Sequence, residues 1–212
     1  MKKLFKLFVG LAAVCALTAC GGGKGSEVSS AEFKKQAAAV EEHEYTGATV
    51  SYNGSVEMSM PDFEKLMTGT VEMKTEKEEL KGEIKFEKKN GEWTTDSTDV
   101  ALDDYFELAN VKDLVANSNF EASLNEMGSS HGVKSNTKFM TGPLGIEISA
   151  KGEVNENGAK GNVDVYYYMS FDNYGYITRE EIKMNTTSKV SSSSASYESV
   201  MKVDLTVTVS YQ

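Results

Sequence analysis

Two histidines are the side chains best suited to acid–base or metal chemistry in this 212-residue sequence. His43 follows a predicted helix and His131 lies in a loop of glycine and serine, so neither has partners at the spacing of a zinc site. The 32 acidic residues are so numerous that a neighbouring pair such as Asp103 and Asp104 does not indicate a glycosidase, whose carboxylates are recognised by their separation in space. We therefore expect no metal, no cofactor and no enzymatic activity.

Cys20 is the residue whose surroundings indicate a specific reaction. Leu17-Thr18-Ala19-Cys20 ends an apolar stretch that begins at Leu7, behind three lysines. The stretch is shorter than the ~20 residues of a transmembrane helix and has the length of a signal-peptide core. These four residues resemble the lipobox of bacterial lipoproteins. The resemblance implies a diacylglycerol on the Cys20 sulfur and cleavage after Ala19, whereas the alternative is an ordinary signal peptide with a chance cysteine.

The lipobox divides the chain into three expected parts. Residues 1–19 would be the lipoprotein signal peptide, residues 20–28 the lipidated cysteine with a flexible glycine-rich tether, and residues 29–212 a single β-rich domain. Cys15 lies in the signal peptide and Cys20 would carry the lipid. The domain itself then has no thiol, which excludes disulfides, thiol catalysis and cysteine-bound metals.

The chain is acidic, with a formal net charge of −10 at pH 7. A nucleic-acid-binding domain needs a basic surface, so nucleic acid is not an expected partner. Acidity also disfavours electrostatic binding to anionic lipids, so membrane attachment would depend on the acyl chains, and two chains suffice for a stable anchor. The expected location is extracytoplasmic, on the cell membrane of a Gram-positive host or the outer membrane of a Gram-negative one.

Two segments have helical periodicity. Ser29-Ser30-Ala31-Glu32 is typical of a capping box, and a narrow apolar stripe follows it. The second segment, residues 99–117, has the richest apolar helix face in the chain. Its inward positions are Leu102, Tyr105, Phe106, Ala109, Val111, Leu114 and Val115. Both segments are expected to lie over a sheet, because a short helix with one apolar stripe is not stable alone.

Alternation of apolar and polar residues predicts strands in most of the remaining chain. Residues 48–60 indicate one long strand with a kink or bulge at Gly54. Residues 67–73 and 80–86 are expected to form a hairpin around a charged turn at Glu76–Glu79. Further strands are expected at 120–124, 133–139, 146–154, 161–169, 180–184 and 203–211.

Two Asn-Gly turns predict the register of further hairpins. The turn at Asn90-Gly91 places Trp93 opposite Lys88. The turn at Asn157-Gly158 pairs Val154 with Gly161, Ala150 with Val165 and Ile148 with Tyr167.

Glu180 interrupts the apolar pattern of its strand. A four-residue turn after Phe171 would pair Val165 with Ile182. It would also place Glu180 opposite Tyr167 on the apolar face. We expect either a β-bulge that removes this conflict or a position for Glu180 at an open rim of the sheet.

Together these elements predict a mainly β (α+β) fold, a curved antiparallel meander or half-barrel of about ten strands with two helical segments over its concave face. In element order, residues 29–211 resemble the carrier-type lipoproteins, which include the outer-membrane lipoprotein carrier and the mycobacterial lipid-carrier lipoproteins. That resemblance implies a membrane-anchored protein that binds or carries a lipid or other hydrophobic ligand. The alternative is a structural or protein-interaction lipoprotein with a packed core and no ligand.

The inner face of the predicted sheet is rich in methionine, which adapts to irregular apolar partners. This composition suits a lipid-binding surface, whereas the alternative is a core in which methionine fills gaps below the helices. The residues expected to line a ligand site are Tyr52, Met58, Met73, Leu102, Phe106, Tyr167, Met169 and Met184.

Overall fold

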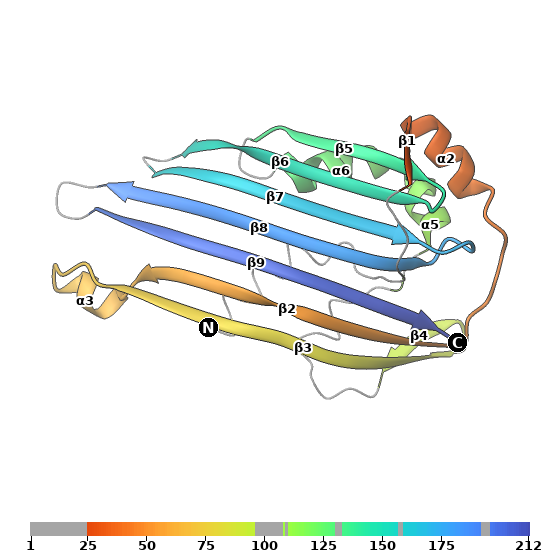
Figure 1. Cartoon of the computed structure of the whole chain (residues 1–212), viewed down its shortest axis with the longest axis horizontal. Coiled ribbons are helices and arrows are strands. Elements are labelled where there is room, and N and C mark those ends of the chain that lie inside the picture. The colour runs from red at the N-terminus through yellow and green to blue at the C-terminus, as the bar shows by residue number, and fades with distance from the viewer. Residues whose placement is uncertain (1–24, 96–107, 109, 130–132, 157–158, 192–195) are drawn as a thin grey trace.

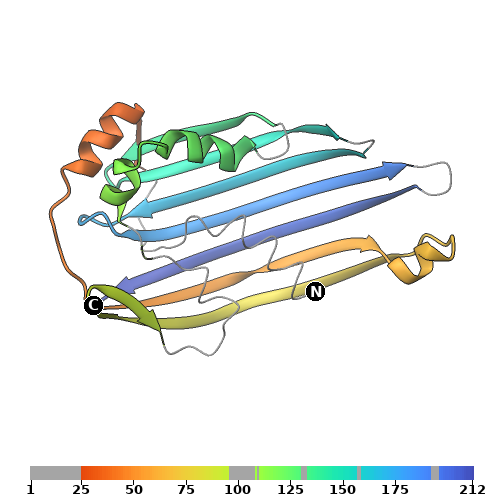
Figure 2. The ribbon, with the colours of Figure 1, turned by 180° about the vertical axis from the view of Figure 1, so that it is seen from behind.

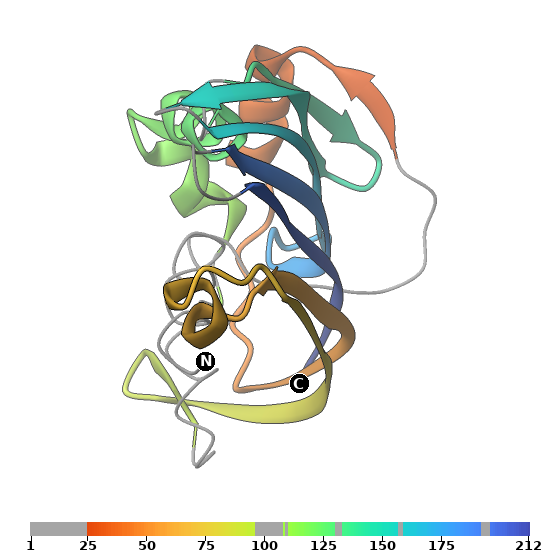
Figure 3. The same cartoon turned by 90° about the vertical axis from the view of Figure 1, so that its left-hand side faces the viewer.

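A computed structural model of the chain describes residues 25–95, 108, 110–129, 133–156, 159–191 and 196–212. Its strands are β1 (Ser26–Val28), β2 (Gly47–Pro61), β3 (Met73–Lys89), β4 (Glu92–Thr95), β5 (Ser135–Thr141), β6 (Gly145–Glu156), β7 (Ala159–Phe171), β8 (Ile177–Ser191) and β9 (Ser196–Tyr211). Its helices are α2 (Ser30–Ala38), α3 (Phe63–Met67), α5 (Val111–Ala116) and α6 (Phe120–Ser129). The described strands form one open, curved antiparallel sheet (Figures 1 and 3), which confirms the predicted fold class.

The sheet consists of two meanders joined by β9. In space the strands follow the order β1-β5-β6-β7-β8-β9-β2-β3-β4. β9 pairs with β8 over residues 196–208 and with β2 over residues 200–211. The meander β2–β4 is therefore held to the meander β5–β9 by the pairing of β2 with β9.

Alternation along the strands gives the sheet one polar and one apolar face. On the convex, polar face, ion pairs join neighbouring strands, such as Lys202–Glu57 (2.7 Å) and Lys138–Glu147 (3.4 Å). Helices α2, α5 and α6 lie on the concave face, on the side of β5 and β6 (Figure 2). The main core is therefore enclosed between these helices and one part of the sheet.

Helix α2 begins where its sequence predicts. Ser29 is the N-cap, and its hydroxyl accepts a hydrogen bond from the Glu32 amide (3.2 Å). Phe33 and Ala37 are fully buried, which confirms the predicted apolar stripe. The ring of Phe33 lies 5.1 Å from that of Phe139 on β5, so α2 is packed directly on the sheet.

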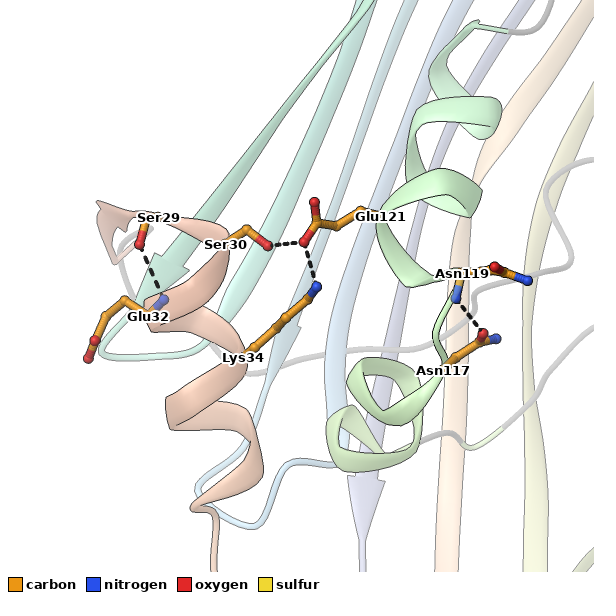
Figure 4. A network of polar contacts seen from close by, with 7 residues as sticks. All are labelled: Ser29, Ser30, Glu32, Lys34, Asn117, Asn119 and Glu121. Atoms are coloured by element: carbon orange, nitrogen blue, oxygen red, sulfur yellow. Dashed lines mark hydrogen bonds and ion pairs between the residues drawn. The ribbon is translucent and has the colours of Figure 1, made fainter.

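Helix α6 replaces the strand predicted from Phe120 to Leu124, and that prediction is wrong. The two residues are four positions apart, so they share a face in a helix as well as in a strand, and both are buried. On the outer side of α6, Glu121 accepts a hydrogen bond from Ser30 (2.6 Å) and pairs with Lys34 (Figure 4). These contacts join α6 to α2.

Strand β3 also differs from the prediction. The expected turn at Glu76–Glu79 is absent from this described segment, because residues 73–89 form one 17-residue strand along β2. The chain turns earlier, through α3 and Gly69, which has a φ of 84°. Residues 74–81 contain no glycine, proline or asparagine that would favour a turn, and β2 supplies a partner of matching length.

The hairpins at the two Asn-Gly turns have the predicted register. Trp93 lies opposite Lys88, and the positive φ values of Asn90 (55°) and Gly91 (87°) are those that such a turn requires. In the second hairpin the three predicted pairs are all formed: Val154 with Gly161, Ala150 with Val165, and Ile148 with Tyr167.

The register between β7 and β8 differs from the prediction by two residues. Val165 lies opposite Met184, and a register shift occurs between Ser170 and Phe171. A shift of two residues keeps each side chain on its predicted face. A register irregularity is therefore present, but it does not remove the conflict, because Glu180 stays on the apolar face opposite Met169. Glu180 is 1% exposed and so does not lie at an open rim either, and both expected outcomes are wrong.

Two further details differ from the prediction. Ser26–Val28, which was assigned to the tether, forms β1 and pairs with β5. Strand β2 passes Gly54 with no register shift against β3 or β9, so no bulge occurs there.

The turn between β7 and β8 fixes the position of α5. Gly175 has a φ of 81°, and its carbonyl accepts a hydrogen bond from the amide of Val111, the first residue of α5 (2.7 Å). The Asn110 amide group donates to the Tyr174 carbonyl (2.9 Å). A Cβ on Gly175 would lie 2.8–2.9 Å from atoms of Val111, Asn110 and Val40. Only glycine fits at this position.

Gly175→Ala should lower the free energy of unfolding by roughly 2–4 kcal/mol, because it combines an unfavourable φ with overpacking. Gly69→Ala is the matched control, since Gly69 also has a positive φ but no atom lies within 4 Å of its Cβ position. It should cost only about 1–2 kcal/mol. Urea unfolding of both variants checks this; equal losses would contradict the steric argument.

Candidate functional site

The strand register arranges the concave-face side chains in rows that cross the sheet. One row consists of Met169, Glu180, Val207 and Tyr52 on β7, β8, β9 and β2. The next row consists of Tyr167, Ile182, Leu205, Gly54 and, on β3, Leu80. The third row consists of Val165, Met184, Val203, Val56 and, on β3, the charged residue Glu78. We call the second and third rows the central rows.

Burial changes from the first row to the central rows. Met169, Glu180 and Val207 are almost completely buried and belong to the part of the face enclosed near the helices. In contrast, the central-row members Ile182, Leu205 and Leu80 are only half-buried, and so are the four apolar residues of the third row. A band of apolar side chains therefore remains partly accessible on the concave face, from β7 to Leu80 on β3 in the second row and from β7 to Val56 on β2 in the third.

The predicted ligand-lining residues separate into groups. Tyr52, Met58 and Met184 are half-buried on the concave face, as expected. Tyr167 and Met169 lie in the enclosed core, so they are not available to line an open site. Leu102 and Phe106, like the lipidation candidate Cys20, lie outside the described residues.

Met73 was wrongly assigned to the inner face. It pairs with Pro61 at the outer end of β3, whereas the concave-face residues of β2 are those with even numbers, such as Tyr52 and Met58. Met73 therefore points to the opposite side and is 39% exposed. The error follows from the hairpin predicted at 67–86, which the long strand β3 replaces.

A buried polar pair lies at the border between the enclosed core and the central rows. The Tyr167 hydroxyl donates a hydrogen bond to the Glu180 carboxylate from the neighbouring strand. Tyr167 is 6% exposed and Glu180 1%. Burial of a carboxylate is unfavourable unless the group is hydrogen-bonded. The hydrogen bond from Tyr167 therefore stabilises Glu180 in otherwise apolar surroundings.

Sequence reasoning missed an aromatic cluster at the end of the sheet near the β7–β8 turn. His43 stacks on Tyr174 with ring centroids 4.3 Å apart, and Tyr45 stacks on Tyr211 at 4.6 Å. The Tyr45 hydroxyl donates to Asp172 (2.7 Å). The cluster attaches the segment between α2 and β2 to the turn and to the end of β9; the repeated tyrosines at 174 and 176 were its only sequence signal.

Two tyrosines of this cluster, Tyr45 and Tyr211, have raised pKa values that favour their neutral form. Burial, followed by the hydrogen bond to Asp172, raises the pKa of Tyr45 above its ordinary value. Burial is also the main cause of the raised pKa of Tyr211, whose hydroxyl donates to the Ile177 carbonyl (3.0 Å). Both groups therefore act as hydrogen-bond donors within the fold.

Residues 128–132 have the Gly-x-Ser-x-Gly spacing of a nucleophile elbow, which sequence reasoning also missed. Such an elbow follows a strand and opens a helix. Here the order is reversed, because α6 extends to Ser129 and β5 begins at Ser135. This context does not support a serine nucleophile.

The described residues contain no group of three or more histidine, cysteine or acidic side chains placed to hold a metal ion. Within the same residues, no helix has the length and apolarity to span a bilayer. Comparison of the chain with protein-family models, with curated proteins and with solved structures gave no match. The accessible apolar band beside a buried Glu–Tyr pair is thus the feature on which a function can be argued.

Tyr167→Phe should lower the free energy of unfolding by about 1–3 kcal/mol, because it removes a hydrogen bond from a buried carboxyl group. Tyr166→Phe is a matched control on the convex face, where the hydroxyl donates to half-buried Glu147 at 3.2 Å. It should cost less than about 1 kcal/mol. In a double-mutant cycle by urea unfolding, Tyr167→Phe should cost much less in a Glu180→Gln background; simple additivity would show that the two side chains are not coupled.

Proposed function

We propose that the protein is an extracytoplasmic lipoprotein, anchored by acyl chains on Cys20, whose concave sheet face binds a lipid or other hydrophobic ligand. The anchor is supported by the Leu17-Thr18-Ala19-Cys20 pattern. The first strand begins at Ser26, six residues later. A chain of that length spans at most ~20 Å, so a lipid on Cys20 would keep the sheet close to the bilayer surface.

The ligand-binding part of the proposal rests on one observation, the half-buried central rows. On the convex face, the alternate positions are polar and several form ion pairs, so apolar exposure is not a general property of this sheet. Each apolar Å² removed from water contributes roughly 25 cal/mol, so an apolar ligand covering the band would be stabilised. Met184 within the band and Met58 next to it can adjust to ligands of irregular shape.

A charge placed in the central rows should weaken ligand binding. Met184→Asp should reduce binding of a fluorescent phosphatidylcholine about tenfold or more, because the carboxylate must be desolvated under the ligand. Asn185→Asp is the matched control, since this exposed neighbour lies on the convex face of the same strand. Met184→Leu, which preserves volume and apolarity, should retain binding.

The ligand assay also tests the proposal as a whole. Native mass spectrometry and lipid extraction of the purified protein should find a hydrophobic molecule or show its uptake. If the wild-type protein neither contains nor takes up a hydrophobic ligand, the binding proposal is wrong, and a structural or protein-interaction role with a packed interior is favoured.

The anchor can be tested independently of any ligand. Cys20→Ser should abolish incorporation of a clickable palmitate analogue and move the protein from the membrane fraction to the soluble fraction, since no other acyl acceptor is proposed. Cys15→Ser should leave labelling unchanged, because that residue precedes the proposed cleavage site. Persistent labelling of the Cys20 variant would contradict the lipobox assignment.

A further inference from the structure

Among the described strands, none pairs with the outer side of β3 along most of its length, and we call residues 73–85 the free edge. β4 covers β3 only from Phe86 to Lys89, and no other described strand lies beyond it (Figure 1). Residues 73–85 therefore present backbone N–H and C=O groups along the edge of the sheet. Such an edge is a template for pairing with another chain, and natural proteins usually protect it with charged side chains.

The charges on this edge follow a regular pattern. On the convex face, the sign alternates along the exposed residues Lys77, Glu79, Lys81, Glu83 and Lys85. Lys77 pairs with Glu79 within the strand. Among the described residues, the other three form no ion pair, and their neighbours on β2 are the uncharged Asn53, Ser51 and Thr49.

An alternating pattern makes edge-to-edge pairing depend on register. Two copies of the strand that pair antiparallel about a two-fold axis through Leu80 would place each Glu79 opposite a Lys81 and each Lys77 opposite a Glu83. Opposite charges directly across a ladder are stabilising, and like charges are destabilising. Charges of any order would protect a strand edge from pairing, whereas charges that alternate in sign also favour pairing in one register.

We propose that the free edge of β3 is a docking site for a second copy of this chain, with residues 75–85 of the two copies paired antiparallel about Leu80. The ladder would use almost the whole free edge, from Thr75 opposite Lys85 at one end to the same pair at the other. The two curved sheets would continue into one another. This proposal is independent of the ligand and of the lipid anchor.

Neighbouring registers fit less well. An axis through Glu79 or Lys81 would bring each of these charges against its own copy. An axis through Gly82 would restore opposite charges, but strand β4 of the partner already occupies the edge beside Phe86, so only residues 79–85 could pair. An axis through Glu78 would pair residues 73–83 with Lys77 opposite Glu79, but it would bring the two Glu78 carboxylates together on the concave face. Among these registers, only the Leu80 register combines opposite charges with almost the full length of the edge.

The apolar face also favours this arrangement. Leu80 is half-buried and is the last residue of a central row, next to Gly54. Pairing about Leu80 would bring the two leucines into contact and remove apolar surface from water. The second row would then continue from one copy to the other through the two leucines, whereas the third row ends on β3 at Glu78, which would lie opposite Gly82 of the other copy.

The test is the oligomeric state of the full-length protein, measured by sedimentation equilibrium in density-matched detergent micelles over a concentration series. The wild-type protein should dimerise reversibly. Lys81→Glu should raise the dimer dissociation constant about tenfold or more, because each Glu79 then faces a glutamate. Lys160→Glu is the control for net charge; it is exposed and lies on β7, away from the edge, and should dimerise like the wild type.

Charge exchange tests the register. Glu79→Lys/Lys81→Glu restores opposite charges in the Leu80 register and should recover the wild-type dissociation constant, whereas in the Gly82 register it creates only like-charge pairs. Lys81 lies opposite uncharged Asn53 within its own sheet, so Lys81→Glu should change the thermal unfolding of the monomer little when it is measured at a protein concentration below the dimer dissociation constant. A monomeric wild type, a dimer insensitive to Lys81→Glu, or a double variant that stays weak would each overturn the proposal.

Discussion

The pairing of β9 with β2 is the interaction on which the rest of the structure depends. It joins two meanders whose strands are otherwise paired with their sequence neighbours. Without it, the central rows would be cut between Val203 and Val56, and β2–β4 would be an isolated three-strand unit with one exposed apolar face. This ladder extends over residues 48–59 of β2, so the two meanders form one continuous sheet.

The concave face is enclosed unequally because the helices are attached on one side. The described helices α2, α5 and α6 are held together by contacts such as Ser30–Glu121, and the first and last of them pack against β5. Apolar side chains near them are buried, whereas the central rows farther along the strands, apart from Tyr167, are half-buried at their apolar positions. The hydrogen bond between Tyr167 and Glu180 lies at the border between the buried and the half-buried parts of this face. It explains how a carboxylate can be buried among apolar side chains.

Features of the fold that depend on neighbouring residues could be predicted from the sequence, whereas features that depend on distant residues could not. Asn90-Gly91 specifies both a turn type and a register, so the pairing of Lys88 with Trp93 could be predicted from adjacent residues. Phe120 and Leu124 satisfied helical and strand periodicity alike, and local pattern could not decide between them. The long strand β3 and the β9–β2 ladder depend on partners far away in sequence, so the position of Met73 and the central rows could only come from the three-dimensional arrangement.

The same alternation of residues that separates the two faces also determines what the free edge can bind. On the convex face of β3 the charges alternate in sign, so two copies of this strand can match opposite charges there. The concave face of the same strand presents Leu80 midway along the edge, between Glu78 and Gly82, so the two leucines can meet on that side. Edge and concave face therefore meet at one residue, so an oligomer built on this edge would enlarge the accessible apolar band rather than cover it.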